Sequence, residues 1–217
     1  MFKIHHFKKL NSTNIKAKDS KINSVIIADE QTKGKGRFKR LWKSNKGGIY
    51  VSLVLPKTTT PYIYTFIAAL SAKKALNIKK IKIKWPNDLI YENKKICGIL
   101  TEIKENKAIV GIGINTNNQT KISKAISLKK ITKHKINNKK IINKLLSNFE
   151  SYLKSKHSKI ISDWKKNSFL GSKIKVKTLD KTYEGTAYNI DEDGFLILKL
   201  KNKKIKIREG DITLKSS

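Results

Sequence analysis

The sequence has 217 residues, enough for one ordinary domain and a small second one with a buried core. Its formal net charge of +33 comes mostly from Lys spread over every segment, so charge alone does not predict a specific nucleic-acid site. A single cysteine excludes an intrachain disulfide and fits the cytoplasm, the four histidines lack a second metal ligand at useful spacing, and no apolar run predicts a membrane span or an export signal.

The N-terminal segment predicts a strand followed by a helix. Residues 1–9 are half apolar and are expected to form the first strand. The sequence NSTN at residues 11–14 then offers turn and N-cap chemistry before a lysine-rich helix. Ser12 and Thr13 are therefore either helix-capping residues or ligand-binding hydroxyls, which suit a small polar ring because they donate and accept at once.

A cationic loop, residues 33–46, lies between two predicted strands. Residues 23–29 form a β-branched buried strand, and residues 49–55 form a second one that Pro56 stops. The loop carries seven positive side chains, no acid, and two of the three arginines in the chain, Arg37 and Arg40. Its glycines allow backbone N–H groups to approach phosphate oxygens, and Arg supplies a planar fork of donors. The loop therefore predicts a phosphate site.

Residues 62–76 have apolar side chains at helical spacing and predict an amphipathic helix against the sheet. Residues 81–85 then alternate into Pro86, which ends this strand and fixes a turn in which Asn87 and Asp88 face a common point. Residues 91–95 are expected to be a hairpin connection, and residues 96–103 and 108–114 are expected to pair across a turn at 105–106.

Three glycines inside these strands, Gly98, Gly111 and Gly113, indicate either close approach of a ligand or bulges. Cys97 lies in an apolar run and is expected to be a small buried filler rather than a nucleophile. We expect the strand at 108–114 to be the subunit edge if the chain forms a homodimer.

The C-terminal half predicts a change of structure at residues 167–172. Residues 117–138 are polar and predict a loop with one helical turn or more, and residues 139–166 predict one long helix or two helices broken near His157. After the boundary, five short alternating strands in about 47 residues are typical of a small antiparallel barrel of the SH3-like kind. We therefore expect an α+β chain with two domains, 1–168 and 169–217.

Taken together, GKGRFKRLW, KWPND, KICG and GIGIN resemble the biotin-protein ligases, also called biotin-[acetyl-CoA-carboxylase] ligases, over about residues 5–217. The resemblance implies a class II synthetase-like catalytic domain with a mixed sheet backed by helices, in a short form without room for an N-terminal DNA-binding domain. It also implies the cofactors ATP, biotin and Mg²⁺, and transfer of biotin to one lysine of the biotin carboxyl carrier protein of acetyl-CoA carboxylase.

The resemblance also assigns roles to individual positions. Ser12, Thr13 and Gln31 correspond to groups that bind the ureido ring, and Gly34, Gly98 and Gly111 to backbone positions that line the same pocket. Lys35 stands where many members have Arg against the biotin carboxylate and the phosphate; it keeps the charge and loses the fork. Arg37 and Arg40 correspond to phosphate clamps and Trp42 to an aromatic that encloses the nucleotide. Lys84, Asn87 and Asn115 correspond to nucleotide and phosphate contacts, and Lys95 to the catalytic lysine.

The chemistry explains why these residue types are needed. Attack of a carboxylate on the α-phosphate brings two anions together, so cations at Lys35, Arg37, Arg40 and Lys95 would neutralise the repulsion. We assign Asp88 the task of orienting or deprotonating the acceptor lysine. A lipoate- or octanoate-transferring enzyme and a nucleic-acid-binding module driven by charge are the alternatives.

Overall fold

The computed structural model describes residues 2–60, 62–120 and 122–214, so Met1, Lys121 and residues 215–217 of the predicted segments lie outside the described residues. The elements, in chain order, are β1 (Lys3–Phe7), α1 (Thr13–Lys18), β2 (Ser24–Ala28), a 3₁₀ turn (Arg37–Lys39), β3 (Ile49–Pro56), α2 (Ile63–Leu76), β4 (Lys82–Lys84), β5 (Asp88–Tyr91), β6 (Lys94–Lys104), β7 (Lys107–Ile114), α3 (Leu128–Thr132), α4 (Asn138–Leu153), α5 (His157–Lys166), β8 (Lys173–Lys177), β9 (Thr182–Ile190), β10 (Leu196–Lys199), β11 (Lys204–Ile207) and β12 (Asp211–Leu214). No helix of the described residues is long and apolar enough to cross a membrane.

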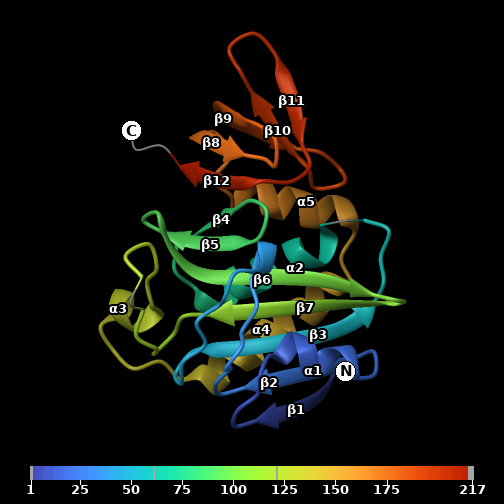
Figure 1. Cartoon of the computed structure of the whole chain (residues 1–217), viewed down its shortest axis with the longest axis vertical. Helices are drawn as coiled ribbons and strands as arrows, with labels where there is room; N and C mark the ends of the chain where they lie inside the picture. Colours follow the sequence, from blue (N-terminus) through green and yellow to red (C-terminus); the bar gives the residue numbers. More distant parts are fainter. Residues whose placement is uncertain (1, 61, 121, 215–217) are drawn as a thin grey trace.

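The first part of the chain folds around a mixed sheet with the order β1-β2-β3-β7-β6-β5-β4. Only β1 and β2 are parallel; every other pair is antiparallel. The five residues of β2 are all buried, as are the first seven of β3. Both faces of the sheet are covered, since α1 packs on β2, β3 and β7 while α2 and α4 lie on the other face (Figure 1). The predicted mixed sheet backed by helices is therefore confirmed.

The central helix α2 differs from the amphipathic helix that we predicted. Its residues from Thr65 to Ala72 are all buried, because α4 and α5 cover the side of α2 that faces away from the sheet. The Phe66 ring stacks on Trp164 of α5 at a centroid distance of 4.6 Å. Residues 139–166 form two helices, not one, and α5 begins at His157.

Strand β5 is not among the predicted elements, because the sequence places Asp88 in the proline turn and Tyr91 in the hairpin connection and assigns no element to Leu89 and Ile90. In the structure Asp88 pairs with Lys84 of β4 and with Gly98 of β6. The turn at Glu105 and Asn106 is confirmed. Strand β7 is not a subunit edge as we expected, because β3 and β6 hydrogen-bond to its two sides.

The C-terminal part is an antiparallel sheet with the order β11-β10-β9-β8-β12. The five predicted strands are present, but β11 and β12 end the sheet, so hydrogen bonding does not close it into the full barrel that we expected. The sheet lies against the β4 and α5 end of the larger part (Figure 1). Trp85 Nε1 donates to the Gly194 carbonyl at 2.8 Å and Tyr62 donates its hydroxyl to the Arg208 carbonyl at 2.6 Å, which fixes the two parts together.

Candidate active site

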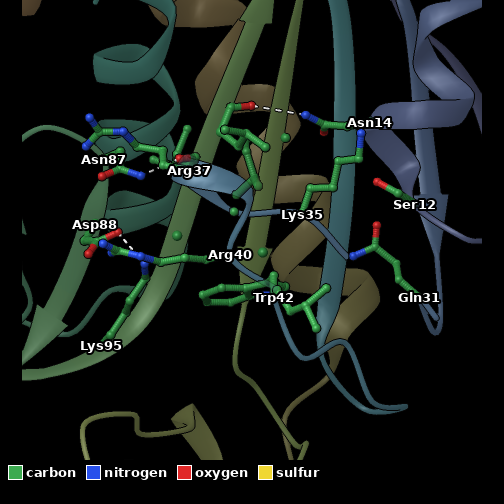
Figure 2. Close-up of a pocket in the computed structure, with 18 of the residues that line it drawn as sticks. Ser12, Asn14, Gln31, Lys35, Arg37, Arg40, Trp42, Asn87, Asp88 and Lys95 are labelled. Atoms are coloured by element: carbon green, nitrogen blue, oxygen red, sulfur yellow. Dashed lines mark hydrogen bonds and ion pairs between the residues drawn. The ribbon is translucent and has the colours of Figure 1, made fainter. Parts of the chain in front are cut away.

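The cationic loop meets the segment that runs from the proline turn to β7 in one cavity of about 250 Å³. The polar residues near α1 line one side, the proline turn with β6 lines the other, and side chains of the cationic loop lie between them (Figure 2). The predicted site residues in its wall are Ser12, Thr13, Gln31, Lys35, Arg37, Arg40, Trp42, Asn87, Asp88, Lys95, Gly98 and Gly111. Pairing of β5 with β6 and of β6 with β7 brings together the predicted residues of the proline turn, β6 and β7, although these residues are spread over positions 87–111.

Three predicted residues lie outside this wall. Lys84 and Asn115 line an adjoining cavity of about 600 Å³ that shares Arg40, Trp42 and Lys95 with the first. Gly34 is buried beneath the loop, where a Cβ atom would lie 2.4 Å from the Trp42 carbonyl oxygen. This close approach explains why the loop needs glycine at that position.

The cationic loop is a tight hairpin whose tip is the 3₁₀ turn. Gly36 N–H donates to the Arg40 carbonyl at 2.8 Å, and Trp42 N–H donates to the Gly34 carbonyl at 2.9 Å. Phe38 and Lys39 adopt left-handed φ values of 53° and 57° at the tip. The hairpin therefore holds its arginines and Trp42 over the cavity.

Trp42 packs on the glycines of β6 and β7. A Cβ atom at Gly113 would lie 2.4 Å from Trp42 Nε1, and one at Gly98 would lie 2.9 Å from the ring. The strand register is continuous at both glycines, so they permit a close contact and are not bulges. Lys95 Nζ lies 5.2 Å from the ring centroid. Trp42 Nε1 is buried and has no hydrogen-bond partner among the described residues.

On the opposite side, the Asp88 carboxylate lies between Lys95 of the same wall and Lys84 of the adjoining cavity. Lys95 Nζ lies 2.6 Å from Asp88 Oδ1, an ion pair rather than a directed hydrogen bond, and Lys84 Nζ lies 3.8 Å from Asp88 Oδ2. Burial lowers the pKa of Lys84, and the charge of Asp88 offsets only part of this effect. Asn87 donates from Nδ2 to the Ile99 carbonyl at 2.7 Å, which anchors the proline turn on β6.

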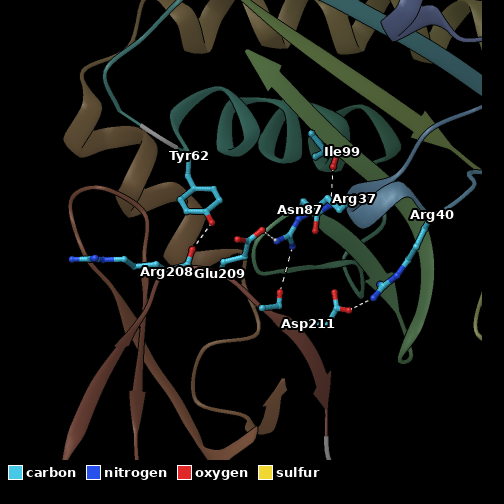
Figure 3. A network of polar contacts seen from close by, with 9 residues as sticks. Arg37, Arg40, Tyr62, Asn87, Ile99, Arg208, Glu209 and Asp211 are labelled. Carbon is cyan, nitrogen blue, oxygen red and sulfur yellow. Dashed lines mark hydrogen bonds and ion pairs between the residues drawn. The ribbon is translucent and has the colours of Figure 1, made fainter. Parts of the chain in front are cut away.

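The loop arginines contact acids of the C-terminal sheet (Figure 3). Arg37 donates to Glu209 at 3.2 Å and to the Gly210 carbonyl at 3.4 Å, and Arg40 pairs with Asp211. The Arg37 side chain is 19% exposed and Arg40 is 63% exposed. Asp211 also lines the cavity. In this structure the predicted phosphate clamps are therefore held by carboxylates.

The far end of the cavity carries Ser12, Thr13 and Gln31, which we call the polar end. The Gln31 Oε1 atom accepts from the Thr13 backbone N–H at 2.7 Å and lies 3.0 Å from the Thr13 hydroxyl. Ser12 occupies the N-cap position of α1, but its side chain makes no capping hydrogen bond. Of the two open interpretations of Ser12, the geometry favours a ligand-binding hydroxyl.

Two polar side chains of the wall were missed by sequence reasoning. Asn14 lines the cavity beside Thr13 and belongs to the same NSTN sequence, so the signal was available. Asp211 lies about 170 residues from the loop, and nothing in its local sequence indicates the contact. Cys97 is fully buried, as predicted, and burial raises the pKa of its thiol. No cluster of His, Cys, Asp and Glu within the described residues could hold a metal ion.

The chain belongs to the biotin/lipoate A/B protein ligase family, whose model matches residues 5–117. The biotin protein ligase C-terminal domain model matches residues 169–215.

Individual relatives agree with this assignment. A bifunctional ligase/repressor BirA of Bacillus spizizenii is 33% identical over 88% of this chain, and the chain spans 66% of that relative's length. A biotin-[acetyl-CoA-carboxylase] ligase of Mycobacterium tuberculosis is 24% identical over 87% of this chain and 77% of its own length. The structure of a biotin protein ligase from Aquifex aeolicus in complex with biotin and ATP has a TM-score of 0.90 at 27% identity, covering both chains completely.

Proposed function

We propose that this chain is a biotin-protein ligase that activates biotin with ATP and transfers it to a lysine of a biotin carboxyl carrier protein. The observation that supports this most directly is the single cavity in which hydroxyl and amide groups lie at one end and the cations of the loop and of β6 at the other. A ligand with a neutral polar ring and a terminal carboxylate fits that distribution of groups.

In the first step a biotin carboxylate oxygen attacks the α-phosphorus of ATP, and the bond to pyrophosphate breaks. Lys35, Arg37, Arg40 and Lys95 would neutralise the charge that meets there. Arg37 and Arg40 must exchange Glu209 and Asp211 for phosphate oxygens. Mg²⁺ would arrive with ATP on the phosphates, because Asp88 and Asp211, the carboxylates of the cavity wall, are each paired with a cation.

In the second step the neutral amine of a carrier lysine attacks the biotinyl carbonyl carbon, and AMP leaves. This amine must first lose a proton. Asp88 is the carboxylate that we assign to orienting or deprotonating it, since Asp88 lies in the cavity wall against Lys95.

The role of Asp88 has a direct test. Replacing Asp88 with Asn should slow transfer from preformed biotinyl-adenylate and largely spare pyrophosphate release. Asp88 also pairs with Lys95, so it could instead serve the first step by positioning that lysine. An equal loss in both half-reactions would contradict the assignment to transfer.

The same proposal includes a carrier protein as acceptor, Mg²⁺ bound with ATP, and a cytoplasmic setting, where ATP is abundant. It includes no specific nucleic-acid partner. A homodimer would need a surface other than β7, because both sides of that strand are paired.

Binding of biotin and of lipoate by the full chain, each measured by calorimetry with and without ATP, tests which of the two is the substrate. We expect biotin to bind and lipoate to fail; the reverse would assign the chain to lipoate transfer.

A further inference from the structure

A continuous series of polar contacts runs behind the polar end, from β6 to the cationic loop. Asn14 Nδ2 donates to Glu102 Oε2 at 2.7 Å. Ser52 Oγ lies 2.6 Å from Asn14 Oδ1 and 2.7 Å from Thr13 Oγ1. Thr13 also contacts Gln31, whose Nε2 atom donates to Ser44 at 2.7 Å. Ser52 is fully buried, and Thr13 and Asn14 are almost so.

The ends of this series fix the orientation of both amides. Ser44 gives its hydroxyl hydrogen to the Trp42 carbonyl at 3.0 Å, so it must accept from Gln31 Nε2, and Gln31 Oε1 faces Thr13. Asn14 Nδ2 faces the Glu102 carboxylate and the Leu100 carbonyl, which only accept hydrogen bonds, so Asn14 Oδ1 faces Ser52.

Between these two amide oxygens the hydrogens are one too few. The three contacts Asn14–Ser52, Ser52–Thr13 and Thr13–Gln31 all join oxygen to oxygen, and only two hydroxyl hydrogens are available for them. One of these contacts therefore lacks a hydrogen. Gln31 Oε1 already accepts from the Thr13 backbone N–H at 2.7 Å, whereas Asn14 Oδ1 accepts from Ser52, so the contact left without a hydrogen is the one between Thr13 Oγ1 and Gln31 Oε1. Because Thr13 and Gln31 line the cavity, an N–H group of a ligand can donate to this pair of oxygens.

We infer that Glu102 is a positioning residue that acts through Asn14 and Ser52 to make the polar end select a ring carrying an N–H donor. Glu102 does not line the cavity, and its role is to hold the Asn14 amide in one orientation. This inference rests on the proposed function, because the ureido ring of biotin is such a ring.

Glu102 also has a contact that would give it a purely structural role. Its Oε1 atom lies 3.8 Å from Lys18 Nζ of α1. Loss of that ion pair would reduce stability and would weaken every ligand alike. A test must therefore measure the choice between ligands rather than affinity for one of them.

The substitution Glu102→Gln supplies such a test. A glutamine can donate to Asn14, and the Leu100 carbonyl, at 3.4 Å, then opposes reversal of the Asn14 amide only weakly, so that Asn14 can donate to Ser52. Ser52 can then give its hydrogen to Thr13, and Thr13 can give its own to Gln31, so that each contact has a hydrogen. The polar end would no longer need a donor from the ligand.

The measurement is the dissociation constant, in the full chain, of biotin and of the two cyclic carbamate analogues in which oxygen replaces one ureido N–H. We expect the unchanged chain to prefer biotin over at least one analogue, and Glu102→Gln to reduce that preference by about tenfold. The substitution Ser52→Ala should reduce it similarly, because Thr13 then gives its hydrogen to Gln31. Glu105→Gln on the β6–β7 turn changes an exposed acid that lies 4.0 Å from Lys104 Nζ; it is the matched control and should leave the preference unchanged.

Each outcome decides the matter. An unchanged preference in Glu102→Gln and Ser52→Ala overturns the inference and leaves the proposed function intact. Equal weakening of biotin and both analogues assigns Glu102 a structural role and also overturns it. Failure of the unchanged chain to bind biotin overturns the proposed function and this inference with it.

Discussion

Lys84 is a partly buried ammonium group between the catalytic cavity and the C-terminal sheet. It donates to the Ile212 carbonyl at 3.1 Å, and burial lowers its pKa from the ordinary value of 10.5. The unfolded chain therefore binds this proton more tightly than the folded chain, so the free energy of unfolding should increase as pH rises through the lowered pKa. We propose that Lys84 also contacts a phosphate of ATP, as the family resemblance predicts, and the affinity gained from that contact should decline over the same range.

The substitution Lys84→Arg separates these effects, since arginine stays charged at every pH used. We expect the KM for ATP of the unchanged chain to rise at alkaline pH before ordinary lysines titrate, and that of Lys84→Arg to rise less. The KM measured from neutral pH to about pH 10 checks this, with Lys82→Arg, an exposed lysine of the same strand, as control. Identical pH profiles for Lys84→Arg and the unchanged chain would exclude a role in phosphate binding.

The Trp42 ring packs directly on Gly113, and the contact leaves no room for a methyl group. A Cβ atom there would lie 2.4 Å from Nε1 and 2.6 Å from Cε2 of Trp42. Gly113→Ala should therefore displace the ring and weaken ATP binding by about tenfold, through loss of stacking on the base. Trp42→Ala should have a similar effect.

The double substitution tests whether both changes act through the same contact. If they do, Gly113→Ala should cost nothing further when Trp42 is already Ala. Calorimetric titration with ATP gives the four dissociation constants. Losses that add in the double variant would mean that Gly113 acts on the nucleotide independently of Trp42.

At the scale of elements, the cationic loop is held by β12 and the turn before it. Arg37 and Arg40 pair with Glu209 and Asp211 across the boundary between the two parts of the chain. Exposed ion pairs contribute little individually, so the two pairs together stabilise this loop position by about 1 kcal/mol. That is roughly fivefold in an equilibrium between held and released loop.

Only three arginines occur in the chain, which makes this loop position measurable with an arginine-specific protease. Cleavage after Arg37 and Arg40 should be about fivefold faster in the double variant Glu209→Gln/Asp211→Asn than in the unchanged chain. The variant Asp180→Asn/Glu192→Gln removes two exposed acids elsewhere in the C-terminal sheet and should leave the rate unchanged. Equal loop cleavage in all three proteins would show that the acids do not hold the loop.

The elements differ in how well the sequence alone predicts them. Strands β2, β3, β6 and β7 were predicted because long β-branched runs have few other stable arrangements. Strand β5 was missed because four residues directly after a turn carry too little pattern. Apolar residues at helical spacing predict an amphipathic α2, but Ala68, Ala69 and Ala72 are also buried, because α4 and α5 pack on the helix.

At the scale of the whole molecule, the cavity could be predicted only in part. The loop was identifiable because arginine is rare in this chain, and the proline turn because Trp85, Pro86 and Asn87 form a distinctive sequence. The carboxylates Glu209 and Asp211 were not identifiable, because acids in a turn and at the start of a short strand have no distinctive pattern and their partners lie about 170 residues away. Long-range pairing of this kind depends on how the C-terminal sheet lies on the larger part.

A mass measurement tests most directly whether the chain transfers biotin to a carrier. The full chain is incubated with ATP, Mg²⁺, biotin and a biotin carboxyl carrier domain, and the carrier is weighed before and after. We predict an increase equal to one biotinyl group, dependent on ATP and lost when the acceptor lysine is replaced by Arg. An unmodified carrier, from a chain that is folded and supplied with all four components, would contradict the assignment of this cavity to biotin transfer.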